Sequence, residues 1–217
     1  LVSGNALNAE QATKLKAAIR DRKSIVISGA THSGKTTLLT ACLNEFDEQE
    51  RLISVEDTFE LHCQVEDWVA LQTREDPAVG GSLVDLRRLI RESLRMRPTR
   101  LAVGEVRGAE AAELLVALNS GVPAYLTIHA NSAKDVPSRI AALGLLHSVS
   151  REAMNAQLGS AFDLLIHLHS VNNRRSIESI NIVKEIVDNI SLDYDFDKTE
   201  VYFTGHSLGG MLASVAS

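Results

Sequence analysis

The sequence has little cysteine, no excess of positive charge and few aromatic residues, and the first two absences narrow its function. Its two cysteines, Cys42 and Cys63, lack the spacing of metal ligands, and their apolar neighbours indicate small core side chains rather than a disulfide or redox pair. The formal net charge of −6 argues against general binding of nucleic acid, because that affinity depends on neutralising phosphates. We therefore expect a globular protein of the reducing cytoplasm, without nucleic acid as a partner.

Membrane and export signals are also missing from the sequence. No stretch approaches the roughly 18 consecutive apolar residues that a membrane helix needs, so any membrane association is expected to come through partners. No N-terminal stretch has the order of a signal peptide. The chain starts at Leu1 rather than Met and stops inside a predicted helix at Ser217, so we expect an excerpt of a longer protein.

Short apolar, β-branched runs alternate with longer segments of helical periodicity, over a length that suits one domain or one domain with a fragment of another. The predicted strands are 24–28, 52–55, 68–72, 101–104, 125–128, 164–168 and 176–183. The predicted helices are 9–22, 35–46, 83–96, 109–119, 133–145 and 151–158, with a loop at Gly80 and Gly81. This alternation predicts an α/β fold with a mainly parallel sheet, helices on both faces, and ligands beyond the carboxyl ends of the strands.

One segment matches the phosphate-binding pattern G-x-x-x-x-G-K-[ST] in full. It consists of Gly29, Ala30, Thr31, His32, Ser33, Gly34, Lys35 and Thr36, and Thr37 follows it. It lies between a predicted strand and a predicted helix, which is the context that confirms the motif. Its glycines let successive amides surround a β-phosphate, Lys35 would bridge the β- and γ-phosphates, and the Thr36 hydroxyl would bind Mg²⁺. The sequence thus predicts a site for a nucleoside triphosphate with Mg²⁺.

Acidic residues follow two of the predicted strands. The strand 101–104 ends at Gly104, where an Asp often stands, so Glu105 is left to orient water or to reach Mg²⁺. The strand 52–55 is followed by Glu56, Asp57 and Glu60. We expect this strand to lie next to the phosphate-loop strand, so that Glu56 completes the metal site; without the loop, the acidic pair would be read as a solvated turn.

Basic residues flank the second acidic strand. They are Arg95, Arg97, Arg100 and Arg107, whose planar guanidinium groups suit phosphate oxygens, and Arg107 is taken as a catalytic candidate. Three further arginines on the helix of Arg95 are expected on a solvated face or a subunit contact: Arg87, Arg88 and Arg91. His129 closes the strand 125–128; a lone His there is often structural, but its place on the active edge favours a sensor of the γ-phosphate.

Four segments together resemble the type II/type IV secretion and pilus-assembly ATPase family, most of all the tight-adherence (Flp) pilus motors, with conjugative-transfer ATPases close behind. In order, they are SGATHSGKTTLL, ISVEDTFEL, LRMRPTRLAVGEVRGAEA and LTIHANSA, which match the Walker A, Asp box, Walker B and His box of that family. The resemblance covers residues 1–180. It implies a RecA-like P-loop core whose ATPase activity powers pilus assembly or protein secretion.

The resemblance also implies roles for single residues. Lys35 and Thr36 would bind ATP and Mg²⁺, Glu56 would be an Asp-box carboxylate, Glu105 the Walker B glutamate, and His129 the His-box histidine. Members of the family work as cytoplasmic hexamers with nucleotide between subunits. They dock on a platform protein of the inner membrane, so the resemblance implies a location peripheral to that membrane.

Two departures from the family pattern stand out. Many members read Gly-His-x-Gly shortly before the His box, where this chain has Gly121, Val122, Pro123 and Ala124. Members also have an N-terminal domain that contributes arginines to the nucleotide, and this chain carries at most its closing linker at 1–6. By this resemblance we expect the chain alone to bind nucleotide and to hydrolyse it weakly.

Residues 181–217 do not share the resemblance. Within them, the segment VYFTGHSLGG is similar to the G-x-S-x-G nucleophile elbow of a lipase, with Ser207 as nucleophile and the Leu208 amide near the oxyanion. In that fold the Asp and His of the triad follow the serine, and neither follows Ser207 here. The tail is therefore read first as a piece of a lipase-like domain, then as a coincidental strand-turn-helix, and last as a working hydrolase.

Three alternatives stay open beside the motor ATPase. Another P-loop enzyme, such as a GTPase or small-molecule kinase, would use the same loop, although the sequence has no Asn-Lys-x-Asp guanine-reading segment. A serine hydrolase would use Ser207. A nucleotide-binding subunit would keep the loop and have no turnover of its own.

Overall fold

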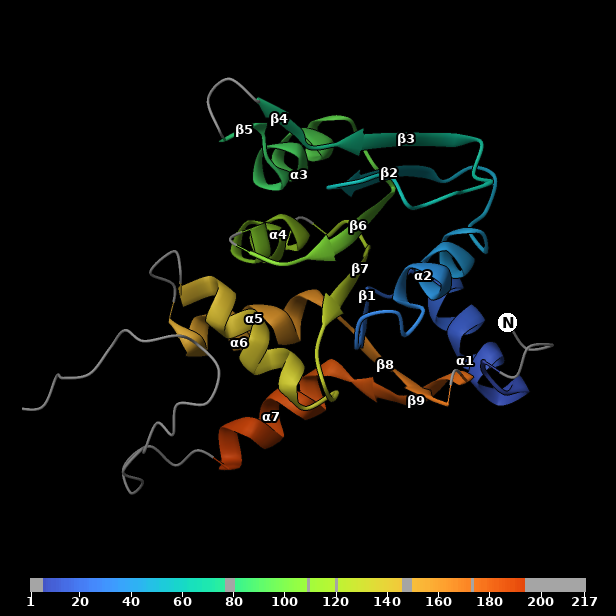
Figure 1. The fold of residues 1–217 in the computed structure, drawn as a ribbon, viewed down its shortest axis with the longest axis vertical. Coiled ribbons are helices and arrows are strands. Elements are labelled where there is room, and N and C mark those ends of the chain that lie inside the picture. The colour runs from blue at the N-terminus through green and yellow to red at the C-terminus, as the bar shows by residue number, and fades with distance from the viewer. Residues whose placement is uncertain are drawn as a thin grey trace, which may run out of the picture.

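The computed structural model describes residues 6–76, 81–108, 110–119, 121–145, 150–172 and 174–193, which form an α/β fold around a seven-stranded sheet (Figure 1). The strands are β1 (Ile25–Gly29), β2 (Arg51–Glu56), β3 (Asp67–Gln72), β6 (Arg100–Val106), β7 (Ala124–His129), β8 (Leu164–Val171) and β9 (Arg174–Ile182). Their order is β3-β2-β6-β7-β1-β8-β9, and each pairing is parallel except that of β8 with β9. The prediction of a mainly parallel α/β sheet is confirmed.

The central strands are apolar on both faces. Each residue of β1 is buried, and β2, β6 and β7 are buried along nearly their whole length. Parallel strands with this composition require helices on both sides of the sheet. Their sequences are therefore nearly continuous apolar runs, which is why the amino-acid pattern alone predicts these four strands.

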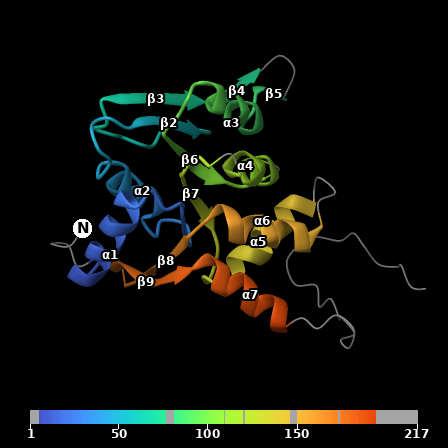
Figure 2. The ribbon, with the colours of Figure 1, turned by 180° about the vertical axis from the view of Figure 1, so that it is seen from behind.

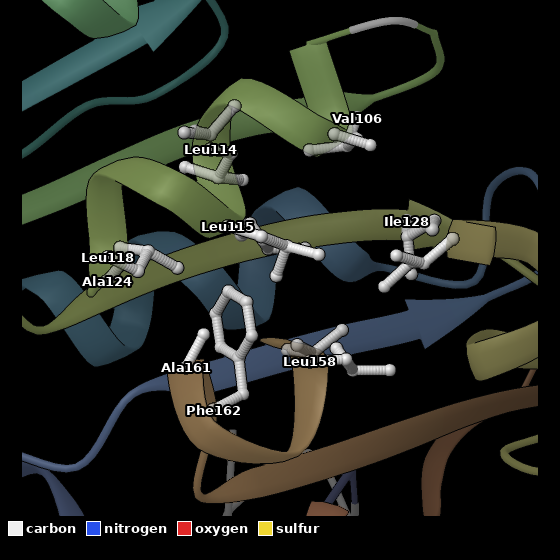
Figure 3. Packing of buried hydrophobic residues seen from close by; sticks show 14 of the residues in the cluster. Val106, Leu114, Leu115, Leu118, Ala124, Ile128, Leu158, Ala161 and Phe162 are labelled. Atoms are coloured by element: carbon white, nitrogen blue, oxygen red, sulfur yellow. The ribbon is translucent and has the colours of Figure 1, made fainter. Parts of the chain in front are cut away.

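Helices cover both faces of the sheet, as the two opposite views show (Figures 1 and 2). They are α1 (Ala9–Arg20), α2 (Lys35–Leu43), α3 (Leu86–Arg95), α4 (Glu110–Leu118), α5 (Asp135–Leu145), α6 (Arg151–Ala161) and α7 (Val183–Asp193). Helices α1 and α2 share one apolar cluster with the sheet, and α3 to α7 share another. In the second cluster, Leu115 of α4 and Leu158 of α6 meet over β7 (Figure 3). The helices thus bury both faces of the sheet, and the parallel strands end on one side of it.

Helix α3 begins later than the prediction of a helix over 83–96. The Asp85 carboxylate accepts a hydrogen bond from the Arg88 amide at 2.8 Å, so Asp85 caps the helix and the chain before it is extended. Residues Gly81–Val84 form the short strand β5, which pairs antiparallel with β4 (Arg74–Asp76). Gly81, which was predicted to lie in a loop, therefore belongs to a strand.

The segment after β9 forms a helix that the sequence analysis did not predict. Val183 and Val187 of α7 are buried in the same apolar cluster as α4 to α6. Residues 194–217, which include Ser207 and the lipase-like segment, lie outside the described residues. None of the helices in the described part of the chain combines the length and the apolarity that crossing a membrane requires.

The expectation that β2 lies next to the phosphate-loop strand β1 is wrong. Strands β6 and β7 lie between them. The reason is burial: β6 and β7 are apolar on both faces and take central places, whereas β3, which follows β2 in the chain, is only half-buried and forms the edge. Along the chain, β3 is therefore added on the outer side of β2, and β6 and β7 come later and lie between β2 and β1.

Both cysteines are free thiols. Cys42 is a buried residue of α2, and burial raises the pKa of its thiol to about 12. Cys63 is half-buried against the same cluster, and burial raises its pKa to about 11. Neither is poised as a thiolate at neutral pH, which agrees with the prediction of small core residues.

Candidate active site

The loop between β1 and α2 is shaped by its two glycines. A Cβ on Gly29 would lie 2.5 Å from Ser33 Oγ and 2.7 Å from the Leu168 carbonyl oxygen, so a larger residue does not fit. Gly34 has a φ of +95°, a conformation that side chains disfavour, and it caps the N-terminus of α2. The loop therefore curls tightly and presents the first amides of α2 at the sheet edge, where a helix terminus favours an anion.

The ammonium of Lys35 lies inside this loop. Its Nζ donates hydrogen bonds to the carbonyl oxygens of Gly29 at 3.1 Å and Ala30 at 2.9 Å, and the residue is only 8% exposed. Burial lowers the pKa of Lys35, and the charge of Glu105 acts in the opposite direction. Two carbonyls are weak partners for a full charge, so the site holds a cation that an incoming anion would satisfy better.

Glu56 is a buried carboxylate at the end of β2. It is 2% exposed, and its Oε2 accepts from the amides of Glu60 at 2.8 Å and Leu61 at 3.0 Å. Its Oε1 is also buried and has no hydrogen-bond partner among the described residues. An unpaired buried oxygen of this kind costs free energy, which marks it as a position where a ligand is expected.

Gly104 on β6 makes room for that carboxylate. A Cβ on Gly104 would lie 3.0 Å from Glu56 Cγ and 3.6 Å from its Oε2. The space that an Asp at position 104 would use is therefore filled by Glu56 from the neighbouring strand β2. The absence of an acid at 104 is thus a packing requirement of this site.

A cavity of about 160 Å³ lies at the carboxyl ends of β2 and β6. Its walls are formed by Thr36, Glu56, Asp57, Thr58, Glu60, Gly104, Glu105 and Arg107. The Thr36 hydroxyl donates to Glu60 Oε2 at 3.2 Å, which joins α2 to the loop after β2. A second link, from the Gln64 amide to Asn44 Oδ1 at 2.8 Å, holds this loop against α2. The loop, rather than strand adjacency, brings Glu60 to the N-terminus of α2.

Glu105 and Arg107 form an ion pair on the rim of the cavity. Arg107 donates to Glu105 Oε2, and this hydrogen bond raises the pKa of Arg107, so the guanidinium stays charged. The Glu105 side chain is 25% exposed and that of Arg107 is 67% exposed. The amides of Arg107 and Gly108 donate to Glu110 Oε1 at 2.6 and 2.7 Å, which fixes the turn after β6. Both side chains are therefore held close to the cavity.

His129 stands at the end of β7, directly beside Gly29 in the parallel register. Its Nδ1 lies 3.5 Å from Thr31 Oγ1, so the histidine contacts the phosphate loop from the neighbouring strand. The predicted residues of the site thus converge on one edge of the sheet, from the ends of β1, β2, β6 and β7.

The prediction that Arg100 contacts phosphate is wrong. It begins β6, at the opposite edge of the sheet, and its guanidinium is 3% exposed and bound to Glu50, Tyr125 and the Ile19 carbonyl. Arg100 is the first residue of β6, and the start of a parallel strand lies on the side of the sheet opposite to the strand ends that form the site. Arg95 pairs with Glu92 at 3.0 Å, and Arg87 and Arg91 pair with Glu113 at 3.3 and 3.2 Å.

Arg175 is a residue beside the site that sequence reasoning missed. A Cβ on Gly34 would lie 3.3 Å from Arg175 Cδ, so this side chain lies against the phosphate loop. It comes from the β8–β9 hairpin, whose antiparallel return carries its tip to the carboxyl edge of the sheet. In the sequence, Arg174 and Arg175 lie in a polar segment, and nothing in this pattern indicates that Arg175 reaches the phosphate loop.

Comparison with known proteins places the chain among secretion proteins. Conjugal transfer protein TrbB of Rhizobium radiobacter is 38% identical over 186 residues, which cover 83% of this chain and 55% of TrbB. The VirB11 ATPase of the Brucella suis type IV secretion system, solved in complex with sulphate, has a TM-score of 0.73 and 29% identity, covering 84% of this chain and 55% of VirB11. The Legionella pneumophila ATPase DotB has a TM-score of 0.64 and 27% identity, covering 84% and 52%.

The chain spans about half the length of the curated relatives it matches. Residues 3–186 match the family described as Type II/IV secretion system protein. The match includes each of the four segments at the sheet edge and extends over β9 into α7. With the geometry of the loop and its acidic neighbours, this shows that the chain belongs to the type II/IV secretion system ATPase family.

Proposed function

We propose that this chain binds ATP with Mg²⁺ at residues 29–36 and hydrolyses it as one subunit of a secretion or pilus-assembly motor. The observation that carries the proposal is the meeting of Thr36 at the end of the phosphate loop, the buried Glu56 and the carboxyl end of β6 around one cavity. Within it, residues 1–180 would form the RecA-like ATPase domain, and the segment assigned to the tail, 181–217, begins with the end of β9 and with α7, which packs in the core of that domain.

Phosphate binding would use the backbone of the loop and Lys35. The ammonium would exchange its two carbonyl partners for oxygens of the β- and γ-phosphates, which are stronger acceptors because they are charged. Ala30, Thr31, His32, Ser33, Thr36 and Thr37 would supply amides at the N-terminus of α2. The sulphate in the related VirB11 structure supports an anion site in this fold.

The residues present fit a magnesium ion. Thr36 offers a hydroxyl oxygen, Glu56 an unpaired buried Oε1, and Glu105 a carboxylate on the same cavity. Together with phosphate and water oxygens, these groups would offer the all-oxygen coordination that Mg²⁺ prefers. When bound, Mg²⁺ would neutralise charge on the phosphates.

Hydrolysis would depend on the end of β6. Glu105 would orient the attacking water once the γ-phosphate competes for Arg107, and the freed guanidinium would offset the charge that develops on the phosphoryl group. His129 lies next to Thr31 and would contact the γ-phosphate of a nucleotide bound in the loop. In this arrangement each catalytic candidate lies at the carboxyl edge of the sheet.

The family membership supports a place in an assembly. The chain would act as a homo-oligomer, a hexamer by resemblance, on the cytoplasmic side of the inner membrane, bound to a platform protein. Relatives named for conjugal transfer and type IV secretion favour transport of macromolecules as the work performed. The domain that precedes the motor domain in the family would complete each site.

Replacing Glu105 with Gln should leave ATP affinity within about threefold of wild type and lower turnover about 100-fold, because the amide fills the same space but orients water poorly. Nucleotide titration and phosphate release measured on the same preparations would check this. Glu152→Gln, an exposed change on α6, is the matched control. Unchanged turnover in the Glu105 variant would move the water-orienting role to Glu56.

A nucleotide-binding subunit without turnover of its own is the second candidate. It is favoured by the ion pair that holds the Glu105 carboxylate on Arg107 within a single subunit. The phosphate-release assay separates the two functions: wild-type chain that binds ATP and releases no phosphate at any protein concentration supports the second candidate.

A further inference from the structure

His167 is a buried polar residue that the proposed chemistry does not use. It lies on β8, beside Ser28 of β1 in the parallel register, and is 3% exposed. Its Nδ1 lies 2.9 Å from Ser28 Oγ, and that hydroxyl is also 3.3 Å from the Ile166 carbonyl oxygen. Ser28 is the residue before Gly29, so one side of the imidazole is attached to the root of the phosphate loop.

The imidazole also interacts with groups on β9 and in the segment that follows His129. The backbone of Asn131, two residues after His129, interacts with the imidazole, and the Nε2 atom of the ring lies 3.6 Å from Glu178 Oε2 on β9. Asp135 at the start of α5 and His169 on β8 are the other titratable groups that act on it. Burial holds the pKa of His167 below its usual value, so the ring is neutral at pH 7.5 and each nitrogen keeps a distinct role.

We propose that His167 is a positioning residue that ties the root of the phosphate loop to the His129 segment and thereby sets the preference of the site for ATP over ADP. The inference rests on the proposed nucleotide site and deepens it. His129 touches the loop at Thr31 and pairs with Gly29 in the register, and the imidazole of His167 interacts with Ser28 and with the backbone of Asn131. A contact between the γ-phosphate and His129 would therefore act on a segment that interacts with both the phosphate loop and His167.

A purely structural histidine would behave differently. Loss of a core hydrogen bond loosens the whole edge of the sheet, so ATP and ADP affinities would fall together. Loss of a link between the loop and the His129 segment affects the contact made by the γ-phosphate, while the β-phosphate keeps its amides and Lys35. The ratio of the two affinities is therefore the quantity that separates the roles.

The test uses His167→Ala, His167→Gln and Ser28→Ala, with His169→Ala as the control on an exposed residue of the same strand. The Kd values of ADP and of a non-hydrolysable ATP analogue are measured with Mg²⁺ at pH 7.5, alongside thermal unfolding. We expect His167→Ala and Ser28→Ala to weaken the ATP analogue about tenfold and ADP less than twofold. His167→Gln, whose amide reaches the Nε2 position and leaves Ser28 Oγ without its Nδ1 partner, should show the same loss as His167→Ala, and His169→Ala should match wild type.

Each outcome decides a different claim. Equal weakening of both nucleotides, or none, would overturn the positioning role and leave the nucleotide site intact. Wild-type chain that binds neither nucleotide would overturn the proposed function and this inference with it. If His167→Ala fails to fold, Ser28→Ala carries the comparison, because it removes one hydroxyl from the interior and leaves the imidazole in place.

Discussion

Replacing Lys35 with Ala should weaken ATP binding about 1,000-fold, which corresponds to about 4 kcal/mol. The ammonium is the buried cation of the loop and would donate to two charged phosphates, each such hydrogen bond contributing about 1.5–3 kcal/mol. Without it, the phosphates would be bound by amides and the helix terminus alone. Titration of ATP in the presence of Mg²⁺ would measure the loss.

The fold should survive this substitution. In the structure Lys35 is held by two loop carbonyls, so its removal relieves a buried charge and exposes no apolar core. Lys14→Ala is the matched control, because Lys14 forms an exposed ion pair with Glu10 on α1, away from the site. Unchanged ATP affinity in the Lys35 variant, with the control also unchanged, would refute the assignment of the phosphate site.

Replacing Gly104 with Asp should lower the free energy of unfolding by about 3 kcal/mol and remove the Mg²⁺-dependent part of ATP binding. The new carboxylate would enter the space of Glu56, with which even a bare Cβ is in tight contact at 3.0 Å. Two carboxylates at this distance repel each other, and Glu56 is too buried for water to screen the repulsion. Chemical denaturation and ATP titration with and without Mg²⁺ would measure both effects.

Two further variants separate steric crowding from charge. Gly104→Ala adds only a methyl group and should cost about 1 kcal/mol. The double variant Gly104→Asp with Glu56→Ala returns the site to one carboxylate and should recover at least half of the lost stability. If Gly104→Asp is as stable as wild type, the two positions do not share one space, and the explanation for glycine before Glu105 is wrong.

Much of this site could be predicted because its parts are local. The phosphate loop is a contiguous segment, and the rule that ligands of parallel sheets lie at the carboxyl ends of strands placed Glu56, Glu105 and His129 on one edge. The central strands were recognisable from apolar runs, because helices cover both faces of the sheet.

The errors came from features that are not local. Strand order depends on which strands need burial on both faces, so the sequence neighbour β2 was expected beside β1 while β6 and β7 lie between them. Arg100 was assigned to phosphate because it lies near Glu105 in sequence, although the two residues stand toward opposite ends of β6. Arg175 and His167 reach the site only through the β8–β9 hairpin and the β1–β8 register.

The roles of Glu60 and Gly104 could be recognised only from the structure. Glu60 reaches Thr36 because the loop after β2 folds back on α2, and no pattern in the sequence marks that return. Gly104 stands where an Asp often lies, and the structure relates its lack of a side chain to the packing of Glu56. Both cases involve two segments that meet in space and are separated in the chain.

The most direct test of the account is backbone amide NMR of the chain during addition of ATP with Mg²⁺. The account predicts that the largest shifts fall on the amides of residues 30–36, with smaller shifts at Glu105 and His129, and that ADP moves the loop amides but leaves His129 nearly unchanged. Loop amides that stay in place at saturating ATP, or shifts centred elsewhere on the fold, would contradict it.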